Sequence, residues 1–172
     1  SDSGGRAIWD SLHPLWRQAL ASGKPITADL TTRIVLPLLR AAVDNGMVSE
    51  GHAFIQEANA AHVPFRDERE RSLWLEDCGN LAVAQGDLSG ALRSFTESKT
   101  ISERLATSDP TNAEWQFDLG IANERLGDLA VRQGKLDEAL VFHSKRKDII
   151  SALAASDPAN AEWQRDLAVS IG

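Results

Sequence analysis

The stretch SDPTNAEWQFDL, residues Ser108–Leu119, recurs 48 residues later as SDPANAEWQRDL, residues Ser156–Leu167. The same shift of 48 residues aligns NLAVAQGDLSGAL (80–92) with DLAVRQGKLDEAL (128–140). Self-similarity at a period of a few tens of residues is typical of solenoids, in which each unit buries its apolar face against its neighbours. The sequence therefore predicts stacked units of one design.

The unit over 108–155 is predicted to form two helices. Asp109 is expected to cap the first, with Pro110 at its first position, where a missing N–H does no harm. Gly134 is expected to end that helix in a left-handed conformation. Because the turn is so short, the two helices should lie antiparallel. Two apolar stripes have helical spacing: Trp115, Leu119, Ala122, Leu126 and Leu129 in the first helix, and Leu136, Ala139, Leu140, His143, Ile149, Ile150 and Leu153 in the second.

The segment DPTNAEWQFDLG, followed by RQGKLDEAL, resembles the tetratricopeptide repeat (TPR) pattern in its Trp, its Leu-Gly pair, its mid-unit Gly and its Ala. The resemblance implies an all-α, right-handed solenoid of antiparallel hairpins, whose first helices line a concave face that binds partners. The usual unit has 34 residues, and the 14 additional residues can be divided as seven per helix, close to two turns. Ala130 replaces the usual aromatic residue, so we expect a close helix approach there.

The pattern divides the chain into six segments. Trp9 and Trp16 lie on one side of a first helix and are expected to pack over the hairpin that follows it. Pro37 is expected inside the first helix of that hairpin, where it should bend the axis. The segments are a leader (1–6), an N-terminal capping helix (7–26), a degenerate hairpin (27–65), a first repeat (66–107), a second repeat (108–155) and the start of a truncated third repeat (156–172).

Composition argues against several classes of partner. The chain has 172 residues, of which 25 are acidic and 18 basic, and its net charge is −7. Its Lys and Arg residues form no run, whereas a nucleic-acid partner requires a concentrated cationic face. No apolar stretch reaches the roughly 18–20 residues that cross a bilayer. We therefore expect a cytoplasmic protein with no nucleic-acid or membrane partner.

Residue patterns typical of enzymes are missing from the sequence. The four histidines lack metal-ligand spacing, and no phosphate-binding loop or nucleophile motif is present. Cys78, the single cysteine, aligns with Leu126 and is interpreted as a small core residue. Trp115 and Trp163 are expected to fill the core between units. The sequence thus predicts no catalytic residue, no metal site and no cofactor.

The remaining candidate is a protein-binding surface on the first helix of each repeat. We expect a non-catalytic scaffold, part of a larger signalling or effector protein of the bacterial type that the repeat resembles, which holds a peptide or helix of a partner. An ordinary solvated face is the competing interpretation. A second hypothesis is self-assembly through exposed apolar residues at the end of the array, Leu167, Val169 and Ile171. The predicted partner-binding residues are Glu76, Asn80, Ala84, Phe117, Ile121, Glu124, Asp128, Arg132 and Arg165.

Overall fold

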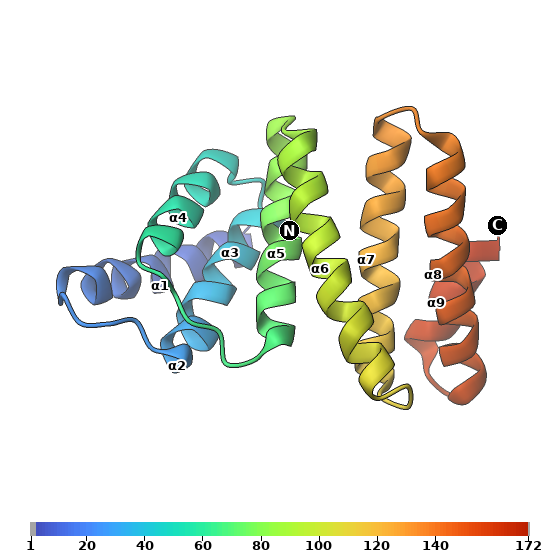
Figure 1. Ribbon diagram of the computed structural model, residues 1–172. Helices are drawn as coiled ribbons and strands as arrows, with labels where there is room; N and C mark the ends of the chain where they lie inside the picture. Colours follow the sequence, from blue (N-terminus) through green and yellow to red (C-terminus); the bar gives the residue numbers. More distant parts are fainter. Residues whose placement is uncertain (1–2, 172) are drawn as a thin grey trace. The chain divides into compact units, whose positions relative to one another are not determined.

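The computed structural model describes residues 3–171, and every regular element in that range is a helix (Figure 1). The predicted all-α fold is confirmed at this level. The described residues form two compact units, one up to Ala91 and one from Leu92 onward. Each unit is described by itself.

In the first unit, two long helices, α1 and α5, enclose a set of shorter elements in the chain order. Helix α1 (Ser3–Ala21) starts inside the segment predicted as a leader, and its end before Ser22 agrees with the prediction. Ser1 and Asp2 lie outside the described residues. The remaining elements are α2 (Ala28–Leu30), the π-helix η1 (Thr31–Val35), α3 (Leu36–Asp44), α4 (Val48–Ala60) and α5 (Glu68–Gln85).

Pro37 is accommodated by a local change of helix type within a continuous helical stretch. The ring nitrogen of Pro37 carries no hydrogen, so the usual bond to the carbonyl of Arg33 cannot form. The chain instead makes a wider π-helical turn, in which the N–H of Leu36 bonds to the carbonyl of Thr31. Helix α3 then begins at Leu36, with Pro37 in its first turn. Pro37 thus lies inside a helical stretch that continues without a break from 28 to 44, as expected, and the π-turn accommodates the missing hydrogen bond.

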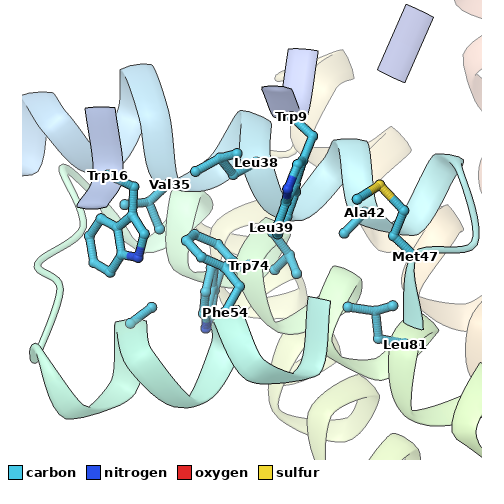
Figure 2. Packing of buried hydrophobic residues seen from close by; sticks show 11 residues of the cluster. Trp9, Trp16, Val35, Leu38, Leu39, Ala42, Met47, Phe54, Trp74 and Leu81 are labelled. Atoms are coloured by element: carbon cyan, nitrogen blue, oxygen red, sulfur yellow. The ribbon is translucent and has the colours of Figure 1, made fainter. Parts of the chain in front are cut away.

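An aromatic cluster forms the core of the first unit (Figure 2). The ring of Phe54 lies edge-on to Trp16 and Trp9, with centroids 5.5 and 5.9 Å apart, and also to Trp74 at 6.2 Å. Trp16 is fully buried, and its indole N–H donates to Glu57 Oε2 over 2.9 Å. Edge-to-face pairs contribute roughly 0.5–1.5 kcal/mol each beyond area burial. The prediction that Trp9 and Trp16 pack over the hairpin is confirmed.

The second unit repeats one helix pattern. It contains most of α6 (Leu88–Ser108), together with α7 (Ala113–Arg132), α8 (Leu136–Ser156) and α9 (Ala161–Ile171). Helices α7 and α8 lie side by side as an antiparallel hairpin (Figure 1). Helices α6 and α8 both have 21 residues, and they start and end at positions 48 apart. The boundaries of these helices thus reproduce the period of the sequence.

The duplicated dozen residues form the joint before α7 and again before α9. Asn112 caps α7, because its Oδ1 accepts from the N–H of Trp115 over 3.0 Å, and Asn160 does the same for Trp163 over 3.2 Å. Asp109, predicted as the cap, instead accepts from the N–H of Thr111 in the preceding turn. The correction arises because Asx side chains close turns as readily as they cap helices.

A second local device, the glycine turn, ends the first helix of each hairpin. Gly134 has φ +74° and Gly86 has φ +81°, a left-handed conformation that glycine adopts without a Cβ penalty. After Gly134, the N–H of Lys135 bonds to the carbonyl of Ala130 over 2.9 Å. Gly46, at φ +62°, makes the same turn between α3 and α4. The hairpin predicted as degenerate therefore closes in the same way as the others.

Small residues let α8 approach α7 closely. Ala122 and Ala130 are buried, and Gly120 faces Ile149 and Ile150. The larger buried side chains of this hairpin are Leu126, Leu129, Ile150 and Leu153. The close approach expected at Ala130 is consistent with its burial.

The two repeated tryptophans occupy more peripheral positions than predicted. Trp115 and Trp163 are each partly buried, so neither is a fully covered core side chain. Each is the third residue of its helix, three positions after the capping asparagine. At a helix end, fewer neighbouring side chains are available to cover an indole ring. Both side chains therefore retain substantial contact with solvent.

Replacing either of two helix glycines by alanine should change the free energy of unfolding, in opposite directions at the two positions. A Cβ on Gly120 would lie 3.5 Å from Ile149 Cγ2, an ordinary contact, whereas a Cβ on Gly51 would lie 2.7 Å from Leu81 Cδ1 and 3.1 Å from Ala42 Cβ. Alanine gains up to about 1 kcal/mol of helix propensity at either position. We expect Gly120→Ala to raise the free energy of unfolding by up to about 1 kcal/mol, and Gly51→Ala to lower it by about 1–2 kcal/mol through overpacking. Urea denaturation followed by circular dichroism measures both, and equal signs for the two variants would contradict the packing described.

Candidate functional site

Metal chemistry finds no support in the described part of the chain. Across residues 3–171, His, Cys, Asp and Glu form no group of three or more that could hold a metal ion. Over the same range, no helix has both the length and the apolar character needed to cross a membrane. Burial raises the pKa of the Cys78 thiol to about 12, with a further contribution from Asp77. At neutral pH this side chain is therefore a protonated, weakly nucleophilic thiol.

The predicted binding residues on α5 do not form an exposed face. Glu76 is only 9% exposed, Asn80 is half-buried and Ala84 is exposed. Next to them, Asp77 is also buried, with its Oδ1 3.1 Å from Nη2 of Arg40 on α3. Burial raises the pKa of Asp77 to about 7, although the Arg40 charge opposes the shift. Adjacent acidic residues normally indicate a solvated helix face, so the residue pattern did not predict this burial.

The predicted residues on α7 share one face of that helix. Phe117, Ile121 and Glu124 are half-buried, and Asp128 and Arg132 are exposed. Their spacings of four, three, four and four residues follow the helical period, so their side chains lie along one stripe. Arg165, the remaining predicted residue, is exposed on α9. The second unit thus holds six of the nine predicted side chains, five of them on one helix.

A cavity of about 420 Å³ lies beside this stripe, between α7, α8 and α9. We call it the three-helix cavity. Its lining combines two apolar side chains with hydroxyl and charged groups: Glu124, Leu140, His143, Ser144, Arg146, Lys147 and Val169. Glu124 is the predicted binding residue that lines it. Leu140 and Val169 are 69% and 74% exposed, so the apolar part of the wall is open to solvent.

Arg146 joins the three helices at the base of the cavity. Its Nε lies 3.3 Å from Glu124 Oε2 on α7, and its Nη2 lies 3.6 Å from Asp166 Oδ2 on α9. The arginine side chain is 12% exposed, and both carboxylates are partly buried. One cation between two partly desolvated carboxylates stabilises their charges and fixes the spacing of the helices.

His143 makes a second link between α7 and α8. Its Nε2 lies 3.6 Å from Asp128 Oδ1. The imidazole ring fits against Gly127, where a Cβ would lie 2.7 Å from ring atom Cε1. The glycine of the second Leu-Gly pair therefore makes room for the ring. Asp128, predicted as a partner-binding residue, thus lies close to His143 across the hairpin.

The ion pairs of Arg146 limit which ligands the three-helix cavity can bind. The guanidinium of Arg146 is already matched by two carboxylates, so it is poorly suited to bind an anionic substrate. The exposed Leu140 and Val169 with a charged rim are the features of a protein-binding surface. From its spacing, His143 was predicted to belong to the packed stripe, whereas Arg146 and Asp166 were not predicted to have a role. The available signal was spacing, because Ala139, His143, Arg146, Ile150 and Leu153 recur at intervals of four, three, four and three.

Removing the central cation should destabilise the second unit. Arg146→Met leaves Glu124 and Asp166 with no cation between them, which is expected to lower the free energy of unfolding by about 1–2 kcal/mol. Replacing all three residues by Met, Gln and Asn should restore most of that loss, since no like charges remain. Chemical denaturation followed by circular dichroism measures both variants. A triple variant no more stable than Arg146→Met would contradict the electrostatic role.

Comparison with known proteins does not identify a family for this chain. No model of a known protein family matches this sequence, and no curated protein is significantly similar to it.

Proposed function

We propose that the protein is a non-catalytic interaction scaffold that binds a peptide or helix of a partner protein. In this proposal its hairpins belong to a TPR-like, right-handed solenoid within a larger bacterial signalling or effector protein of the cytoplasm. The binding surface is the exposed part of the α7 stripe, from Phe117 to Arg132, together with Arg165 on α9. Phe117 and Ile121 supply apolar contacts, and the charged residues set orientation.

The observation that supports this proposal is the composition of one surface. On α7, partly exposed apolar side chains and charged side chains of both signs share a single stripe, which borders the three-helix cavity. Interfaces of moderate affinity combine apolar contacts with a polar rim in this way. The charged groups around the cavity pair across helices, and the Cys78 thiol stays protonated at neutral pH. Both features favour binding over catalysis.

Self-assembly is a second candidate, favoured by the exposed apolar residues of the second unit. Leu136, Leu140 and Val141 on α8 are 62%, 69% and 55% exposed, and Val169 on α9 is 74% exposed. Of the other residues assigned to this hypothesis, Leu167 is half-buried, and the side chain of Ile171 lies outside the described residues. Light scattering separates the candidates, since a chain that stays monomeric at high concentration does not self-assemble.

Charge reversal tests the proposed surface. Asp128→Lys combined with Arg132→Glu should reduce capture of a partner protein from a cell lysate at least fivefold, because the orienting charges are inverted while the fold is kept. Asp29→Arg with Arg33→Asp is the matched control, since it reverses an i,i+4 pair that is 75% exposed on both sides in the first unit. Quantitative mass spectrometry of the captured proteins gives the readout. Equal capture by both double variants would remove this stripe from the binding surface.

A further inference from the structure

We propose that the contact between α3 and α5 in the first unit is pH-sensitive: it is more stable when the carboxyl group of Asp77 is protonated, and it weakens when that group ionises. We call this contact the Asp77 contact. The inference goes beyond the proposed function and does not depend on it. Its basis is a buried acidic side chain whose counter-charge remains in water.

The ion pair that joins the two helices is buried on one side only. Asp77 Oδ1 on α5 lies 3.1 Å from Nη2 of Arg40 on α3, but the Asp77 side chain is 6% exposed and the Arg40 side chain is 44% exposed. Within the described residues, the same Oδ1 is buried and accepts no well-aligned hydrogen bond. A buried carboxylate loses its hydration, and a cation that stays in water compensates for only part of that loss. Ionisation of Asp77 therefore costs free energy in the folded chain.

The groups nearest to Asp77 leave most of this cost in place. Arg40 and a hydrogen bond with the Asn80 side chain favour the ionised carboxyl, whereas the charges of Glu76 and Asp44 disfavour it. Glu76 is itself only 9% exposed, so its charge is weakly screened. Burial has the largest effect of all, and the pKa of Asp77 is raised from 3.8 to about 7.

The other elements packed on α5 bring no counter-charge to Asp77. Helix α4 contacts α5, but its carboxylates, Glu50 and Glu57, lie 3.8 and 2.6 Å from arginines of α1. His52 on the same helix is exposed. The part of α6 that belongs to the first unit, 88–91, carries no charged side chain. The neighbouring Cys78 thiol stays protonated at neutral pH, so Asp77 is the group of this contact that titrates there.

Arg40 has a second partner when Asp77 is neutral. Its Nη1 lies 4.0 Å from Oδ1 of Asp44, one turn further along α3. Protonation of Asp77 therefore does not leave the guanidinium without a counter-ion, and water can complete its hydration. The protonated state gives up little attraction and avoids the cost of a buried charge.

The direction of the pH effect follows from proton linkage. The unfolded chain loses the Asp77 proton near pH 3.8, whereas the folded chain keeps it until about pH 7. Between these values the folded state binds more protons, so the stability of the contact falls as the pH rises. Above the higher value both states are ionised, and this effect no longer changes with pH.

Titration of the Asp77 carboxyl carbon, followed by NMR on the whole protein, tests the electrostatic environment. We expect a midpoint near 7. Arg40→Gln should raise the midpoint and Glu76→Gln should lower it, because these charges act in opposite directions. Asp44→Asn, at a 60% exposed side chain, should lower it by less. A midpoint near 3.8, or one that none of these variants moves, would overturn the proposal.

The effect on the contact itself is measured by native-state hydrogen exchange at about pH 5 and about pH 8. After correction for intrinsic exchange rates, the opening constants of amides near Leu39 and Leu81 should rise about tenfold or more at the higher pH, since one pKa unit corresponds to a factor of ten. Asp77→Asn should remove most of this rise, because its amide side chain is neutral at both pH values.

Two controls separate the Asp77 effect from other titrations. Asp29→Asn removes a 75% exposed carboxylate of the first unit and should exchange like the unmodified chain. Amides near Leu129 and Ile150 in the second unit should respond to pH equally with and without Asp77→Asn. A rise in first-unit opening that persists in Asp77→Asn would assign the effect to other groups, such as the histidines, and would overturn the proposal. Equal opening of the unmodified chain at the two pH values would also overturn it.

Discussion

The packing of α8 along α7 is the constraint on which the second unit depends. Each helix carries an apolar stripe that it cannot shield alone, and burial of that stripe against a neighbour supplies most of the stability of helices of this length. Three local devices make the packing possible: the Gly134 turn reverses the chain, Gly120 and Gly127 admit side chains from α8, and Arg146 holds carboxylates of α7 and α9. The chain then repeats the same joint before α9.

The sequence predicted the helices well because their signals are local. The glycine turns, the apolar spacing and the 48-residue period all lie within short stretches, and α6 and α8 follow that period at both ends. The errors arose where one residue can play two roles. Asp109 closes a turn while Asn112 caps the helix. A local residue pattern does not show which of two such roles a residue takes.

The candidate site was predicted less well, since burial and pairing depend on neighbouring helices. Glu76 and Asp77 have the residue types of a solvated face, yet both are buried in the first unit. Glu124 and Asp128 lie on the predicted stripe, but Glu124 pairs with Arg146 and Asp128 lies 3.6 Å from His143, and sequence spacing identified neither contact. The pairing leaves the exposed apolar residues, rather than the charges, as the most available part of the surface.

Native-state hydrogen exchange tests the central claim, that α7 and α8 shield each other as one cooperative hairpin, most directly. The account predicts the slowest exchange of the second unit at amides facing the helix contact, near Leu126, Leu129, Ile150 and Leu153, with closely similar opening free energies on the two helices. Fast exchange throughout either helix, or protection of one without the other, would show that the stripes are not mutually buried and would contradict the account.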